Sequence, residues 1–325
     1  MIKCGVYQAA AVFLFLVLAS TSLPAQQSKP PIPDEAPVAP EGTQVATEQT
    51  PSAATNADAL RKATQNPVAS RISVPVQNNS NFGISPGNRT QNVLNIQPVV
   101  PVDLSMNWNL IVRSITPIVW QPLPNQPSTP ETGVYGLGDM QPTFFLVPKN
   151  TGKLIWGGGP ILQLPTATNK ALGQGKLGIG PSVVLLTQPG PWTIGALANN
   201  VWSVAGAGGR PVVNQFLLQY FINYNLKKGW YLTTAPILTA NWRASNENTW
   251  TVPFGGGAGR IMKLGFQPVN LSATFYGNGV YPTGTSSWNM RLQIAFLFPK
   301  LTKEQEMMMM QQRLNQMKQQ QAKPK

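Results

Sequence analysis

The stretch WNMRLQIAFLFPK, from Trp288 to Lys300, decides the fold. One set of alternate residues is wholly apolar: Trp288, Met290, Leu292, Ile294, Phe296 and Phe298. The residues between them are Asn289, Arg291, Gln293, Ala295 and Leu297. A period of two separates the two sets onto opposite faces of a β-strand. The stretch therefore predicts a strand with one greasy face and one face that carries Arg and Gln.

The same alternation recurs from Arg71 onward, for example in QFLLQYFINYN (215–225) and PVNLSATFYGN (268–278). We predict twelve strands, near 71–84, 92–104, 107–121, 137–148, 153–165, 176–188, 192–204, 212–226, 229–242, 250–264, 268–281 and 288–299. At about 10 to 15 residues each, they exceed the usual strand of a soluble protein. They suit strands that cross a membrane at a tilt, which need roughly 9 to 11 residues.

The connections between the predicted strands alternate between longer and shorter ones. The longer ones lie near 86–91, 122–136, 166–175, 205–211, 243–249 and 282–287. The shorter ones lie near 105–106, 149–152, 189–191, 227–228 and 265–267, with turn residues in Asn150-Thr151-Gly152 and Lys228-Gly229. Long loops on one side and tight turns on the other are typical of an outer-membrane barrel.

Tryptophans recur at a spacing that fits a bilayer. Trp108 and Trp120 share a strand face twelve residues apart, which at a tilt near 45° separates them by roughly 28 Å along the membrane normal. Similar pairs follow later in the chain. We predict an aromatic girdle of Trp108, Trp120, Trp192, Trp202, Trp230, Trp242 and Trp288.

The composition favours a lipid-facing protein without catalytic or metal chemistry. Charged residues make up 11% of the 325 residues, against roughly 25% in a soluble protein. The chain has no His and a single Cys, Cys4, which excludes His-dependent catalysis and zinc sites with Cys or His ligands. Between Arg71 and Pro299 lie 14 basic and 4 acidic residues without a dense basic cluster, so we expect no nucleic-acid partner.

These observations predict an all-β protein: a single antiparallel transmembrane β-barrel of about 12 strands over residues 70–300. Closure pairs every backbone group, because a barrel has no edge strand. The apolar faces then contact outer-membrane lipid, and the polar faces line the lumen. The predicted lumen-facing polar residues are Asn95, Gln97, Asp103, Arg113, Asp139, Gln215, Gln219, Asn223, Asn270, Arg291 and Gln293.

The two ends of the chain read differently from the barrel. Residues 1–25 combine Lys3, an apolar run and small residues up to Ala25, the pattern of a signal peptide that directs export to the outer membrane of a double-membraned bacterium. Residues 26–69 read as a disordered periplasmic linker with a short helix at 56–65, and 56–69 is a candidate plug. Residues 301–325 read as a periplasmic tail, helical or disordered, rich in Met and Gln.

Several stretches together resemble a known family. They include GKLIWGGGPILQLPTATNKALGQGKLGIGPSVV, QPGPWTIGALANNVWS and RLQIAFLFPK. Residues 71–300 resemble bacterial outer-membrane barrels that carry the label "neuromedin U" or transporter and are related to proteins of the MetA pathway of phenol degradation. The resemblance implies a barrel and the passage of small molecules, apolar ones included. It supplies no catalytic residues.

Two glycine-rich motifs and two carboxylates invite other interpretations. GQGKLG (173–178) lacks the strand before it and the helix after it that a dinucleotide site needs, and GGGAGR (255–260) lacks the Lys-Ser/Thr of a P-loop. Asp103 and Asp139 could run acid–base chemistry, but an ion pair with Arg113 or Arg291 is the preferred interpretation. Arg113 and Arg291 could alternatively give a pore weak anion preference or simply fill the lumen.

The predicted function is passive or facilitated passage of a small solute through the lumen, with no enzymatic activity, no cofactor and no metal. One alternative is a closed structural or adhesion barrel, and a barrel-borne lipid hydrolase is another. A secreted soluble β-sandwich is the fourth. The sequence leaves the solute, the open or plugged state of the lumen and the oligomeric state undetermined.

Overall fold

The computed structural model describes residues 61, 62, 64–69, 71–123, 133–265, 267–298 and 311. The predicted signal peptide, most of the predicted linker and nearly all of the predicted tail therefore lie outside the described residues. Within them, no helix combines the length and the hydropathy needed to cross a membrane.

The described chain forms a single sheet of 15 β-strands. Their bounds are β1 (Ile72–Ile84), β2 (Arg89–Ile96), β3 (Val99–Asp103), β4 (Trp108–Pro122), β5 (Gly133–Leu137), β6 (Gln141–Pro148), β7 (Leu154–Gln163), β8 (Lys176–Thr187), β9 (Trp192–Gly206), β10 (Asn214–Asn225), β11 (Trp230–Thr234), β12 (Ile237–Asn241), β13 (Trp250–Leu264), β14 (Gln267–Val280) and β15 (Trp288–Phe298). Two short 3-10 turns, η2 (Lys227–Gly229) and η3 (Asn246–Asn248), lie in connections.

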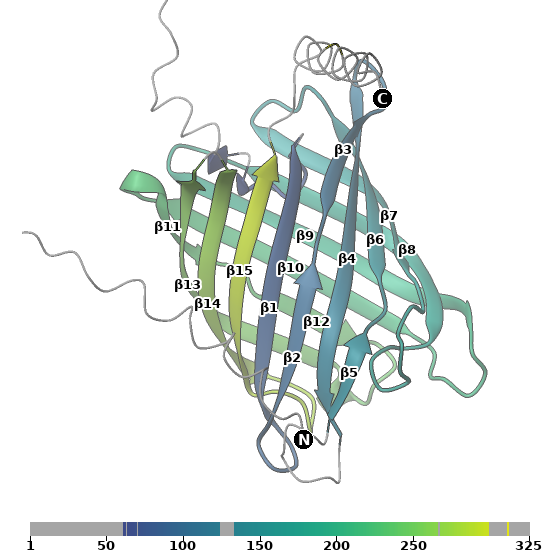
Figure 1. Cartoon of the computed structure of the whole chain (residues 1–325). Helices are drawn as coiled ribbons and strands as arrows, with labels where there is room; N and C mark the ends of the chain where they lie inside the picture. Colours follow the sequence, from purple (N-terminus) through teal and green to yellow (C-terminus); the bar gives the residue numbers. More distant parts are fainter. Residues whose placement is uncertain are drawn as a thin grey trace, which may run out of the picture. The chain divides into compact units, whose positions relative to one another are not determined.

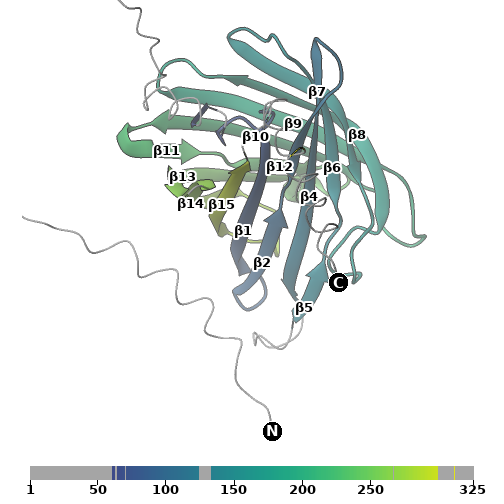
Figure 2. The same cartoon turned by 45° about the horizontal axis from the view of Figure 1, so that its top comes forward.

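The sheet closes into a twelve-stranded antiparallel barrel. Three crossings are interrupted, so β2 with β3, β5 with β6 and β11 with β12 each make one membrane-length strand. Each crossing pairs with its neighbours in sequence, and β1 pairs with β15 from Ile72↔Phe298 to Phe82↔Trp288, which closes the ring. Figures 1 and 2 show β1 beside β15 although they stand at opposite ends of the barrel sequence. The predicted fold class is confirmed.

The faces of the strands follow the predicted alternation. Ile294 and Phe296 of β15 are half-buried on the outer face, and Leu292 is exposed there. Many other large apolar side chains are exposed on the outside of the barrel, among them Leu146, Val183, Leu185, Ile194, Leu232 and Phe275. A water-soluble protein rarely exposes an apolar surface of this extent. The outer wall is therefore a lipid-facing surface.

Prolines mark two of the three interruptions. Gln97-Pro98 separates β2 from β3, and Ala235-Pro236 separates β11 from β12. Proline has no N–H to give to the ladder, so a strand breaks or bulges around it. At the second break, side chains replace the ladder: the Ala235 N–H donates to the Tyr276 hydroxyl, 3.0 Å away, and Arg291 donates to the Ala235 carbonyl at 2.9 Å.

The tight turns lie on the side where the barrel sequence begins and ends. The turns on this side span residues 104–107, 149–153, 188–191 and 226–229. In the last of these, Lys228 (φ 57°) and Gly229 (φ 77°) both take the left-handed conformation, and a Cβ at Gly229 would meet the Ile261 carbonyl. Glycine at 229 is therefore required by the turn.

Two predicted connections differ from the structure. The loop predicted near 122–136 is shorter, because β5 begins at Gly133. The loop predicted near 86–91 is shorter, because β2 begins at Arg89. Gly87 (φ 88°) and Asn88 (φ 51°) turn the chain within a few residues. The remaining loops on that side are longer, for example between β7 and β8 and between β12 and β13.

Candidate functional site

The lumen contains a cavity of about 260 Å³ at its centre. Its polar lining comes from nearly every crossing of the barrel, because inward-facing residues of adjacent strands share a level. The residues include Ser73, Gln77, Asn95, Gln97, Arg113, Gln141, Thr143, Asn199, Gln219, Asn223, Asn270, Ser272, Thr274, Arg291 and Gln293. Its apolar lining includes Val99, Ile115, Ile161, Leu197, Leu217, Phe221 and Ile237. The cavity is thus amphipathic.

The two kinds of lining are distributed unevenly around the ring. The wall of β14, β15, β1 and β2 contributes mostly amides, hydroxyls and Arg291. The wall of β7 to β10, on the other side of the ring, alternates amides such as Asn199 and Gln219 with Ile161, Leu197 and Phe221. A solute in this cavity meets mainly hydrogen-bonding groups on one side and mixed amide and apolar groups on the other.

Two arginines extend into the lumen. Arg113 of β4 donates to the Gln97 amide oxygen at 2.8 Å. Arg291 of β15 donates to the Asn79 side-chain oxygen at 3.0 Å and to the Ala235 carbonyl at 2.9 Å, and its guanidinium lies 5.1 Å from the centre of the Tyr276 ring. Each guanidinium is held by neutral groups rather than by a carboxylate.

A second cavity of about 350 Å³ lies toward the long-loop side. It shares Gln77, Asn95, Ile237, Tyr276 and Arg291 with the first cavity, so the two adjoin at the level of Arg291. Its further lining is mainly polar and includes Asn79, Asn81, Thr239, Thr251, Asn278, Ser286 and Asn289. Together the cavities extend from the long-loop side to the centre of the barrel.

The segment that precedes β1 forms the floor of the inner cavity. Thr64, Gln65, Asn66 and Pro67 line it from the tight-turn side. The amide groups of Gln65 and Asn225 bond to each other twice, at 2.8 and 3.2 Å, and Gln188 donates to the Lys62 carbonyl at 3.0 Å. Of the predicted plug at 56–69, the described residues therefore lie against the inner wall of the barrel.

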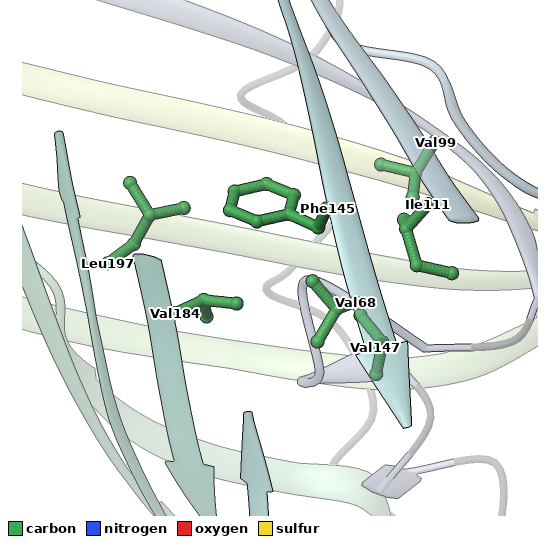
Figure 3. Close-up of a cluster of buried hydrophobic side chains, with 7 residues drawn as sticks. All are labelled: Val68, Val99, Ile111, Phe145, Val147, Val184 and Leu197. Atoms are coloured by element: carbon green, nitrogen blue, oxygen red, sulfur yellow. The ribbon is translucent and has the colours of Figure 1, made fainter. Parts of the chain in front are cut away.

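Val68 is the apolar anchor of this segment. Its side chain is 2% exposed and lies in a cluster with Val99, Ile111, Phe145, Val147, Val184 and Leu197, which project inward from β3, β4, β6, β8 and β9 (Figure 3). Burying a Val side chain contributes roughly 1.5–3 kcal/mol. Together with the amide pair at Gln65, this contact fixes the floor to the barrel wall.

The structure brings eight of the eleven predicted lumen residues together around the inner cavity. They are Asn95, Gln97, Arg113, Gln219, Asn223, Asn270, Arg291 and Gln293. Gln215 lies in β10 on the same strand face as Gln219, nearer the long-loop end. These residues share a strand face because the period of two fixes the direction of each side chain.

The two predicted lumen carboxylates lie away from this cavity. Asp103 stands at the end of β3 near the tight turns, where its side chain is 53% exposed and pairs with Lys149 at 3.0 Å. Asp139 lies in the break between β5 and β6 and accepts the N–H groups of Ala167 and Gln174, at 3.2 and 2.6 Å. Neither carboxylate pairs with Arg113 or Arg291, so the preferred ion-pair interpretation is wrong for these residues.

The Asp139 carboxylate instead holds the connection between β7 and β8. Arg210 supports the same connection by donating to the carbonyls of Lys170, Gly173 and Gln174. These contacts tie loops that are far apart in sequence, so no local pattern indicated them. Among the described residues, no group of three or more Asp, Glu, His or Cys side chains could hold a metal ion.

The seven tryptophans predicted to form girdles lie near the ends of their strands, on the outer face. Trp108, Trp192 and Trp230 are near the tight turns, and Trp120, Trp202, Trp242 and Trp288 are near the long loops. The prediction omitted Trp156, which meets Trp108 edge-on, and Trp250, which meets Trp242 in the same way. The first pair joins β4 and β7, which flank β6, and the second joins the end of β12 to the neighbouring β13.

Four further residues of the site were missed by the sequence interpretation. Gln65 and Asn225 form the amide pair of the floor, and Tyr231 and Tyr276 line the inner cavity. The Tyr231 hydroxyl donates to Asn270 at 2.7 Å. The alternation in β10 predicts Asn225 on the polar face with Asn223, but it does not indicate the partner Gln65, which lies 160 positions away.

Comparisons with known proteins agree with this architecture. No family model matches the sequence. No curated protein matches it either. Among solved structures, the COG4313 outer membrane channel from Pseudomonas putida F1 superposes with a TM-score of 0.55 at 12% identity, over 70% of this chain and 96% of that chain.

Two further solved structures are more distant. Outer membrane phospholipase A from Escherichia coli gives a TM-score of 0.38 at 13% identity, over 71% of this chain and 98% of that chain. The Pseudomonas putida toluene transporter TodX gives 0.35 at 9%, over 70% and 87%. These two are too distant to carry an argument. The first likeness shows a shared fold, in agreement with the twelve-stranded antiparallel barrel of this chain.

Proposed function

We propose that this barrel is an outer-membrane channel for a small, partly apolar solute, and that residues 61, 62 and 64–69 close its lumen. The observation that carries the proposal is the pair of adjoining cavities that ends at the Gln65–Asn225 floor. The channel in Pseudomonas putida F1 that shares the fold supports it. So does the resemblance of residues 71–300 to barrels labelled as transporters.

The mixed lining supports a partly apolar solute. A purely aqueous pore would gain nothing from Ile161, Leu197, Leu217 and Phe221 in its wall. Apolar side chains with a few polar groups among them are typical of small-molecule sites. At about 260 Å³ the inner cavity is slightly smaller than the roughly 300–1,000 Å³ common for such sites, which favours a small solute.

The contacts of the floor are weak enough to open. A hydrogen bond contributes a net 0.5–1.5 kcal/mol or so, and burial of Val68 adds roughly 1.5–3 kcal/mol. The described contacts of residues 61–69 therefore amount to a few kcal/mol. A closed form that dominates and an open form reached by thermal fluctuation are both compatible with this magnitude.

The test is uptake of an apolar dye, phenylnaphthylamine, into vesicles whose outer leaflet is lipopolysaccharide. Vesicles with the full chain should take up the dye several-fold faster than empty vesicles. Leu217→Trp should slow uptake because it fills the inner cavity. Leu218→Trp is the matched control, because Leu218 is on the opposite face of the same strand β10.

Two results would contradict the proposal. One is uptake no faster than in empty vesicles, which would favour a closed structural or adhesion barrel. The other is equal slowing by Leu217→Trp and Leu218→Trp, which would show that the dye does not pass through the lumen.

A further inference from the structure

The described path through the barrel carries positive charge and no counter-charge. Arg113 and Arg291 line the inner cavity, and Arg291 also lines the outer one. Among the described residues that line the two cavities there is no Asp or Glu. Buried charges in proteins are normally paired with an opposite charge, because desolvation of an unpaired charge is costly.

Both guanidinium groups retain donors that no described protein group accepts. A guanidinium has five N–H donors. Arg113 uses one toward Gln97, and Arg291 uses one toward Asn79 and one toward the Ala235 carbonyl. Both side chains line a cavity whose described lining contains no carboxylate.

Three other arginines of the barrel, Arg260, Arg210 and Arg89, have different surroundings. Arg260 lies on the outer face of β13, 5.2 Å from the Trp230 ring centre, where it suits the membrane interface. Arg210 and Arg89 donate to loop carbonyls. Only Arg113 and Arg291, of the arginines in the described strands, line the described path.

The two lumen arginines stand at different depths. Arg291 is three residues from Trp288 at the long-loop end of β15, and Arg113 is seven residues from Trp120 at the same end of β4. Four residues of a tilted strand correspond to about 9 Å along the membrane normal. An acid entering from the long-loop side would meet Arg291 first and Arg113 second.

We propose that the solute of this channel is a small amphipathic monocarboxylic acid, whose carboxylate is held by Arg291 and then Arg113. The planar guanidinium matches a carboxylate with two parallel hydrogen bonds. The apolar body of the acid would lie against Leu217, Phe221 and Ile237, which line the same cavity. This inference rests on the proposed function and adds the chemical class of the solute.

The test compares binding of octanoate and of octan-1-ol to the full chain in lipid nanodiscs, by saturation-transfer NMR, with empty nanodiscs subtracted. The two probes share an apolar body and differ in the acid group. We expect Arg113→Gln combined with Arg291→Gln to weaken octanoate binding about ten- to a hundredfold. Binding of octan-1-ol should change less than twofold.

Arg260→Gln is the matched control, because it removes a guanidinium from the outer face of the barrel and leaves the lumen intact. It should leave octanoate binding unchanged. Arg113→Gln alone guards against misfolding, because Arg113 does not hold the strand break that Arg291 bonds to. The single variant should weaken octanoate binding by part of the full effect while the barrel keeps its heat-modifiable migration in gels.

Equal octanoate binding by the wild type and the Arg113/Arg291 variant, or stronger binding of octan-1-ol than of octanoate, would overturn the inference. The dye-uptake assay separates this failure from that of the proposed function. Rapid dye uptake without preferential octanoate binding would support the channel function and reject a monocarboxylic acid as its solute. Selective octanoate binding without dye uptake would support the carboxylate-binding site and reject the transport of apolar solutes.

Discussion

Val68 is the buried apolar side chain that joins the segment before β1 to the barrel wall. It is 2% exposed, and its neighbours in the cluster come from five strands of the wall. The remaining described residues of its segment are polar or small, apart from Pro67. The seating of the segment therefore depends on this valine more than on any other of its described side chains.

We predict that Val68→Asp opens the channel. A carboxylate in this cluster would lose several kcal/mol of solvation without a partner, which exceeds the few kcal/mol that seat the segment. Single-channel recordings in planar bilayers should show frequent openings for Val68→Asp. Val68→Ile is the control and should keep the wild-type behaviour. Identical recordings from all three proteins would show that Val68 does not hold the closed form.

The sequence could indicate which way a side chain points, but not which side chain it meets. Arg113 and Arg291 were placed in the lumen by the strand period alone, since direction follows from odd or even position. Their partners Gln97, Asn79 and Ala235 follow from register and from the strand breaks, which depend on tertiary structure. The pairing of Gln65 with Asn225 joins positions 160 residues apart and has no local signal.

At the scale of elements, the interrupted strand β11–β12 is the most demanding part of the wall. Pro236 is fully buried, and the Ala235 N–H bonds to a side chain instead of a neighbouring strand. Tyr276 thus satisfies a backbone donor that the ladder leaves unpaired, and Arg291 satisfies the carbonyl of the same residue. One side chain of β14 and one of β15 thus form the hydrogen bonds that the backbone of Ala235 does not form within the sheet.

We predict that Tyr276→Phe destabilises the barrel by about 1–3 kcal/mol, the usual cost of leaving a buried N–H without an acceptor. Urea titration of the refolded protein in lipid, followed by tryptophan fluorescence, would measure this as a lower midpoint with an unchanged slope. Tyr281→Phe is the matched control, because Tyr281 is 41% exposed in the connection after β14. An equal midpoint for both variants would show that the Tyr276 hydroxyl does not support the break.

The presence of the strands could be predicted well, because each membrane crossing is long and its apolar and polar residues alternate. WNMRLQIAFLF runs through the whole of β15 as the period-two pattern predicts. The interruptions could not be predicted in the same way. Pro98 lies inside a stretch whose alternation continues on both sides, and only the pairing of β2 and β3 with different parts of β1 and β4 shows where the strand breaks.

At the scale of the whole molecule, charge is arranged by location. The net charge of the sequence is +13, but the described path contains only the two positive charges of Arg113 and Arg291. The remaining described basic residues lie in the segment before β1, in connections, at strand ends or on the outer face. In a narrow lumen with low-dielectric walls, fixed charges concentrate ions of the opposite sign.

We therefore predict that the open channel prefers anions. In a potassium chloride gradient, the reversal potential of a chain that lacks residues 26–69 should correspond to chloride permeating faster than potassium. Adding Arg291→Gln should reduce that preference, because it removes one of the two lumen charges. A cation preference in the first channel, or no change in the second, would contradict this assignment of charge to the path.

The central claim is that a barrel with a continuous inner path is closed by the segment before β1. Single-channel conductance in planar bilayers, with the full chain and with a chain that lacks residues 26–69, tests it most directly. We predict rare, small openings for the full chain and steady, larger conductance for the shortened chain. Silence of both chains, or equal conductance of both, would contradict the account.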